Sequence, residues 1–164
     1  MATCGMTGPT SDDRPGGSET LMEEIVHKGE LLAIIVRRDY SNPGVHFFTP
    51  HEFSQQLGYM QHGAGKRIQP HVHLPVQLEL TYTQEVLFIR RGKLRVDFYS
   101  SEQTYVESRI LETGDVILLA SAGHGFQVLE DLEMFEVKQG PYSETVDKAR
   151  FDGIEPGDAV IKDL

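Results

Sequence analysis

The chain has 164 residues, with 15 Lys and Arg against 25 Asp and Glu, which gives a formal net charge of −10. A chain of this length is expected to form one domain, whose core can bury about 70% of the surface that the unfolded chain exposes. Its acidity disfavours a nucleic-acid partner, because a phosphate backbone repels it. The longest apolar run, residues 31–36, is too short to span a bilayer, and the single cysteine, Cys4, has no internal disulfide partner.

Residues 1–20 are rich in Gly, Pro, Ser and Thr, so we expect a disordered N-terminal tail. The tail is polar and lacks the apolar stretch of a signal peptide, which predicts a cytoplasmic protein with no membrane partner. A single domain is expected over residues 21–142. Residues 143–164 are mostly polar and are expected to be a C-terminal tail that packs on that domain.

Short runs of alternating apolar residues between turn residues predict an all-β sandwich or barrel. Turns are expected at Gly92-Lys93 and Glu130-Asp131. One short helix is predicted over residues 50–57, because Thr49, Pro50 and Glu52 form a capping box. The predicted strands cover residues 24–27, 30–38, 46–48, 67–73, 78–82, 85–91, 94–99, 104–111, 116–119, 125–129 and 132–137.

Three histidines and one carboxylate predict a metal site. His71 and His73 are two residues apart, so on a strand both imidazoles project from one face. Glu85 opens the next strong strand, where a carboxylate at the first inward position is unusual. His124 follows a later turn. Such a ligand set suits a first-row divalent metal, with open positions for substrate or oxygen.

These residues resemble the two motifs of the cupin superfamily. Gly65 is followed by five residues and then His71-Val72-His73, and Glu85 is followed by six residues and then Gly92. Gly114-Asp115 matches the start of the second motif and His124 its end. The resemblance covers about residues 60–138. It implies an antiparallel jelly-roll barrel with one or two short helices, which holds one divalent metal at its mouth through His71, His73, Glu85 and His124.

The chain departs from the family pattern at two places. Eleven residues, 74–84, separate His73 from Glu85, far more than the pattern has. The excess predicts an extra hairpin over the pocket and leaves Glu79 as a rival ligand, although Glu79 lacks the partner glycine. In the second motif Ala120 replaces the usual proline, and His124 comes one residue early.

Three further residues are candidates for the pocket. Gln69 shares the face of His71 and His73, and Phe126 follows His124 on the same face of its strand. The last strand has two possible parities. We favour the one that places Phe135 and Val137 inside, whereas the other places Glu136 and Lys138 inside, as a buried charge pair beside the site.

The resemblance implies a small-molecule protein. A redox metal would activate oxygen, and any divalent metal would polarise a carbonyl, so we expect an isomerase, epimerase or oxygenase acting on a sugar or keto acid. The alternative is a non-catalytic cupin that binds or senses a small ligand. Iron, manganese, nickel, zinc and copper all suit the ligand set. The chain is also similar to single-domain cupins associated with bacterial polysaccharide and sugar-nucleotide pathways.

A homodimer is expected from residues 30–38. The run Leu-Leu-Ala-Ile-Ile-Val is apolar on both faces, and one small barrel offers cover for only one of them. Dimers built through such strands are also what the resemblance to cupins implies.

Overall fold

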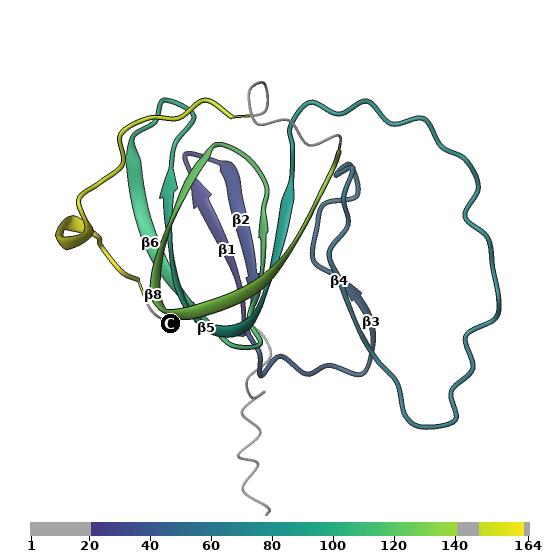
Figure 1. Ribbon diagram of the computed structural model, residues 1–164. Helices are drawn as coiled ribbons and strands as arrows, with labels where there is room; N and C mark the ends of the chain where they lie inside the picture. The colour runs from purple at the N-terminus through teal and green to yellow at the C-terminus, as the bar shows by residue number, and fades with distance from the viewer. Residues whose placement is uncertain (1–20, 141–147, 163–164) are drawn as a thin grey trace, which may run out of the picture.

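The computed structural model describes residues 21–140 and 148–162, and within them the protein is all-β (Figure 1). The one helix in this part of the chain is a short 3₁₀ turn, Pro156–Asp158, so no helix there has the length and apolarity needed to cross a membrane. The strands are Met22–His27 (β1), Glu30–Val36 (β2), Gly44–Phe47 (β3), Gly58–Gln61 (β4), Glu85–Tyr99 (β5), Tyr105–Glu112 (β6), Val116–Leu119 (β7) and Gly123–Lys138 (β8).

A strongly curled antiparallel sheet forms the body of the molecule and closes half of a barrel (Figure 1). Its strands lie in the order β1, β2, β7, β5, β6, and β8 pairs with β5. One edge of β5 pairs first with β7 and then with β6, while β8 follows the other edge for its whole length. The β3–β4 hairpin is a separate two-stranded sheet.

The core lies on the concave side of this sheet. Its side chains are fully buried aliphatic residues and one phenylalanine, each contributing about 1.5–3 kcal/mol relative to an exposed position. On β5 the inward parity changes from odd to even where the register shifts between Ile89 and Leu94. The core residues are Ile25, Leu32, Ala33, Ile35, Leu87, Ile89, Leu94, Val96, Phe98, Leu111, Ile117 and Leu119.

The first hairpin matches the prediction of strand, turn and strand. Lys28 and Gly29 both have positive φ, at 49° and 85°, as a two-residue type I′ turn requires. β2 then runs between β1 and β7, and Ala33, Ile34 and Ile35 are all completely buried. The argument that this strand needs a second copy to cover it is therefore wrong, because one chain already buries both of its faces.

Residues 49–57 form a loop, so the predicted helix is wrong. Thr49 does not cap a helix: its Oγ1 accepts a hydrogen bond from the Leu57 amide at 3.2 Å and donates one to Gln56 Oε1 at 2.9 Å. The only turn inside the loop is the bond from the Phe53 amide to the Pro50 carbonyl. Since a helix this short gains little from its few internal bonds, the side-chain bonds that close the loop prevail.

Residues 62–83, which we call the arm, leave the body of the molecule as one wide excursion (Figure 1). The predicted turn at 63–66 is present, with the Lys66 amide donating to the Gly63 carbonyl. The predicted strands at 67–73 and 78–82 are wrong. The segment has no β-partner among the described residues, every arm residue is exposed, and Pro70 and Pro75 have no amide hydrogen to donate.

The two turns predicted at Gly92-Lys93 and Glu130-Asp131 are also wrong, because β5 and β8 continue through them. Both strands bend there, and the bends lie against each other. A Cβ on Gly92 would come within 2.1 Å of the Asp131 carbonyl oxygen, and Gly92 has a φ of +93°. The glycine thus permits a bend with close backbone approach rather than a chain reversal.

The later part of the C-terminal segment, residues 151–162, packs against β5 and along the edge of β6. Arg95 donates to the Pro156 carbonyl at 2.9 Å, and the Ser108 amide donates to the Val160 carbonyl at 2.9 Å. The expected N-terminal tail, Cys4 and residues 143–147 and 163–164 of the expected C-terminal tail lie outside the described residues.

Candidate functional site

Glu85 is a buried carboxylate at one end of the core. It begins β5 and lies on the same face as Leu87 and Ile89, with only 5% of its surface exposed. The strand is fixed at this point, because the Gln84 amide donates to Gln139 Oε1 at 2.8 Å. A charge buried among apolar side chains requires partners, so its neighbours define the site.

Three basic side chains surround this carboxylate. His124, from the start of β8, places Nε2 3.3 Å from Glu85 Oε2. Lys138, at the end of β8, and Lys148, beyond it, place their Nζ atoms 3.5 and 3.6 Å from Oε1. The two carboxylate oxygens therefore face different groups, an imidazole on one side and two ammonium groups on the other.

These neighbours hold Glu85 ionised. The hydrogen bond with His124 is the main cause that lowers its pKa from 4.5 to about 2; burial opposes it, and the charges of Lys148 and Lys138 add to it. A carboxyl group with so low a pKa is a poor general acid at neutral pH. It is well suited to bind a cation, or to serve as a fixed negative charge in the site.

β8 carries the imidazole and an apolar wall beside it. His124 and Phe126 pair across the sheet with Phe98 and Val96, so both lie on the concave side. Their rings are 5.2 Å apart. Phe126 is nevertheless 42% exposed, because the half-barrel is open here. The sequence prediction that Phe126 shares the face of His124 is confirmed.

His71, His73 and Gln69 lie on the exposed arm, and among the described residues the two histidines do not join Glu85 and His124 in one group of ligands. The two imidazole rings lie 5.3 Å apart. His71 Nδ1 is 2.9 Å from the Gln69 carbonyl oxygen, which can only accept, so Nδ1 is the donor. This bond leaves His71 Nε2 with the lone pair that a metal would need. The structure thus holds the four predicted ligands as two separate pairs.

The parity favoured for the last strand is wrong. Glu85 pairs directly with Lys138, and Phe88 with Phe135, which puts Lys138 on the concave side and Phe135 and Val137 on the convex side. Phe135 and Val137 are 56% and 59% exposed. Register with β5, rather than side-chain hydrophobicity, decides which face is inside.

Lys148 is the member of the site that sequence reasoning missed. It lies in the segment expected to be a tail, and no motif marks it. Its place beside Glu85 depends on how residues beyond β8 return to the sheet, which no local pattern in the sequence encodes.

Glu85 and His124 have the spacing of two neighbouring ligands of one metal ion. A carboxylate oxygen and an imidazole nitrogen each bind a metal at about 2.0–2.2 Å. When they occupy neighbouring coordination positions, the two ligand atoms lie about 3.0–3.4 Å from each other. The observed separation of Oε2 and Nε2 falls in that interval. Within the described residues no three His, Cys, Asp or Glu side chains converge on one point, so His71 and His73 complete a site only if the arm moves.

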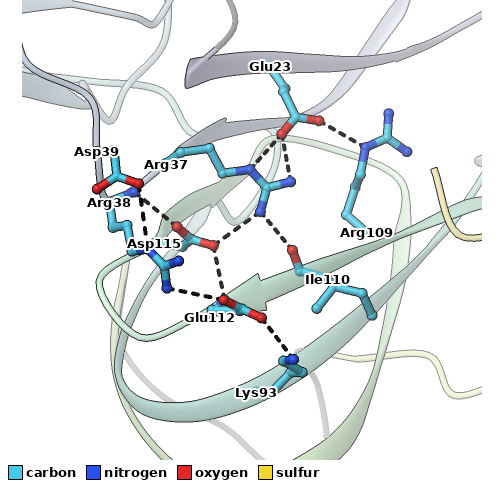
Figure 2. Close-up of polar contacts among 9 residues, drawn as sticks. All are labelled: Glu23, Arg37, Arg38, Asp39, Lys93, Arg109, Ile110, Glu112 and Asp115. Atoms are coloured by element: carbon cyan, nitrogen blue, oxygen red, sulfur yellow. Dashed lines mark hydrogen bonds and ion pairs between the residues drawn. The ribbon is translucent and has the colours of Figure 1, made fainter. Parts of the chain in front are cut away.

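A second polar cluster lies at the opposite end of β7 (Figure 2). Glu23 accepts from Arg37 at 2.7 Å and from Arg109 at 3.0 Å. Arg37 also donates to Asp115 Oδ2 at 3.1 Å. Nearby, the pKa of Glu112 is lowered chiefly by its hydrogen bond with Lys93. These charges neutralise one another and link β1, β2 and β6, so we interpret the cluster as a network that stabilises the fold.

The Glu85 end of the sheet is therefore the better candidate of the two. Its carboxylate, imidazole and ammonium groups come from separate segments and lie at the open side of the half-barrel. In comparisons with known proteins, no family model, no curated protein and no solved structure matches this chain.

Proposed function

We propose that this protein is a metal-binding member of the cupin superfamily that acts on a small molecule. In this proposal the curled sheet is the body of a jelly-roll barrel. One divalent transition metal is held by His71, His73, Glu85 and His124. The observation that carries the proposal is the Glu85–His124 pair: an ionised, buried carboxylate and an imidazole at the spacing of two neighbouring ligands.

The donor set supports this assignment. A metal needs deprotonated ligands, and the low pKa of Glu85 provides the carboxylate at any ordinary pH. The bond from His71 Nδ1 to the Gln69 carbonyl fixes the tautomer that presents Nε2. The imidazole and carboxylate ligands suit iron, manganese, nickel, zinc and copper alike.

The remaining groups of the site would bind the substrate. Lys138 and Lys148 place two positive charges on the side of Glu85 away from His124, where they attract the anionic group of a keto acid or an acidic sugar derivative. Phe126 offers an apolar surface beside His124. When bound, the metal supplies a Lewis acid for isomerisation or epimerisation, or a redox centre for oxygen activation.

A non-catalytic ligand-binding protein is the second candidate. The two lysines beside Glu85 favour it, because they would attract an anionic ligand without any metal, in addition to their ion pairs with Glu85 and, for Lys138, with Glu136. Turnover separates the candidates. An enzyme converts a candidate sugar or keto acid, or consumes oxygen, when loaded with one of the metals. A sensor shows ligand-induced thermal stabilisation and no conversion across the same panel.

Metal content tests the proposal directly. The protein is purified without added metal and analysed by inductively coupled plasma mass spectrometry. We expect about one divalent metal per site, a sharp loss in His73→Ala and His124→Ala, and a weaker affinity in Glu85→Gln than in Glu79→Gln. His27→Ala is the control and keeps its metal. An unchanged metal-to-protein ratio in the double variant His71→Ala, His73→Ala would show that the ligand set is wrong.

A further inference from the structure

The arm carries an uncovered apolar stripe. Ile68, Val72, Leu74, Val76, Leu78, Leu80 and Tyr82 are each between 48% and 82% exposed, and all have even numbers. From 67 to 83 the odd positions carry polar residues, His71 and His73 among them, with Pro75 as the exception. If the arm adopts a β-strand conformation on contact with another chain, its side chains alternate, and the stripe and the histidines then lie on opposite faces. A contiguous apolar surface of this size on a protein marks a contact with another protein surface.

The arm's own chain does not cover this stripe. The arm leaves β4, runs outside the β3–β4 hairpin on the side away from the main sheet, and returns only at the start of β5 (Figure 1). Were the arm to fold back on its own sheet with its histidines toward the site, the stripe on its other face would be left facing water.

The body of the molecule offers the complementary surface. β8 pairs with β5 on one edge, and no strand in residues 21–140 and 148–162 pairs with its other edge. On the concave side Phe126 and Val128 are exposed beside His124, and on the convex side Phe88, Phe135 and Val137 are exposed. An unpaired edge next to apolar surface is a position where an extended segment of another chain adds.

We propose that two copies of this chain exchange their arms, so that His71 and His73 of one copy join Glu85 and His124 of the other. The exchange rests on the proposed metal site and adds that each site is shared between two chains. One face of the arm carries the histidines to the site, and the stripe on its other face is buried between the copies. The contact is self-complementary, because each chain has one arm to give and one β8 to receive it.

Mixing two inactive variants tests the exchange. His71→Ala, His73→Ala removes one ligand pair, and Glu85→Gln, His124→Ala removes the other. Co-refolded in equal amounts, half of the dimers contain both variants, and one of the two sites in each such dimer has all four ligands. We expect metal to recover to about one quarter of the wild-type content. If the wild type binds metal and the mixture does not, the site lies within one chain and the exchange is wrong.

The mass in solution provides a second readout, with a matched control. We expect a dimer of twice the 18.4 kDa chain mass by sedimentation. Val76→Asp, Leu78→Asp on the apolar face should shift it to the monomer, while Gln77→Asp, on the polar face between them, should leave the dimer intact. A wild-type monomer, or equal effects of the two changes, would overturn the proposal.

A disulfide reports the exchange without any metal, so failure of the metal site and failure of the exchange remain distinguishable. Cys4→Ser leaves no other thiol, and His73→Cys, His124→Cys then adds one on the arm and one at the site. On oxidation, arm exchange gives a covalent dimer on a non-reducing gel. A cross-link within one chain, or none, contradicts it even if the wild type proves to hold no metal.

Discussion

Glu85 and Lys138 are direct cross-strand partners, and Lys138 Nζ lies 3.5 Å from Glu85 Oε1. This pairing sets the parity of the end of β8 and turns Phe135 and Val137 outward. It also places a fixed positive charge next to the carboxylate proposed to bind metal. The positive charge of Lys138 repels a metal cation that binds to Glu85 and attracts an anionic ligand. The lysine should therefore lower the affinity for the metal and raise the affinity for the anion.

Lys138→Met should therefore strengthen metal binding and weaken anion binding. Removing one nearby positive charge from a partly buried site is worth about 1 kcal/mol, so we expect metal affinity to rise about fivefold. The affinity for an anionic ligand such as a keto acid should fall by a similar factor. Both are measured by isothermal titration calorimetry. Lys162→Met is the control, because Lys162 lies along the edge of β6 and pairs with Glu107 rather than with Glu85. A loss of metal affinity in Lys138→Met would contradict the electrostatic argument.

The stability of the metal-free protein should depend on Glu85 in acid. Its pKa is lowered from 4.5 to about 2 in the folded protein, so the unfolded chain binds the proton more tightly. The stabilisation is complete above about pH 4.5 and is lost as the pH falls toward 2; it amounts to about 3 kcal/mol. Urea unfolding in chelator should show a difference between wild type and Glu85→Gln that shrinks over this range. A constant difference would mean that the pKa of Glu85 is not lowered.

The class of fold and many strands could be predicted from sequence, because alternation and turn residues are local signals. The β1–β2 hairpin is an example, since Lys28-Gly29 between two apolar runs specifies a two-residue turn. β6 and β7 likewise lie near their expected positions. The cupin resemblance and the jelly roll are not decided by these elements and remain predictions.

What could not be predicted depends on contacts between distant segments. Gly92-Lys93 has the composition of a turn, but the approach of Asp131 makes it a bend within one strand. The run 67–73 alternates as a strand does, yet it has no partner among the described residues. Lys148 joins the site only through the return of the chain past β8. In each case the local sequence pattern fits both the expected and the observed structure, and contacts with distant segments of the chain decide between the two.

Asp115 should be a major determinant of stability. It is 3% exposed, and its carboxylate accepts from the Arg38 and Glu112 amides, both at 2.9 Å, and from Arg37 (Figure 2). Asp115→Asn replaces an acceptor oxygen by a donor and leaves the Arg37 charge partly unpaired, which should cost about 3 kcal/mol in unfolding free energy. Asp39→Asn is the matched control. That carboxylate is 77% exposed and pairs with Arg38 only at 3.7 Å, so its loss should cost under about 0.5 kcal/mol. Equal effects of the two changes would contradict a structural role for the network.

Gly92 should tolerate no side chain at all, because two independent constraints meet there. Its φ of +93° is unfavourable for any other residue, and a Cβ would also lie 2.1 Å from the Asp131 carbonyl oxygen and 3.0 Å from the Leu132 Cα.

A matched variant at Gly29 separates the backbone strain from the steric clash. It has a similar φ of +85°, but a Cβ there meets nothing within 4 Å. Gly29→Ala should therefore cost only the backbone strain, about 1 kcal/mol. Gly92→Ala must in addition push β5 away from β8 where both strands bend, and backbone cannot yield as a flexible side chain does. We expect it to destabilise by about 3 kcal/mol or more beyond Gly29→Ala, measured by thermal unfolding, and to lower the metal content with it. If the two variants unfold alike, the bends of β5 and β8 are not in contact.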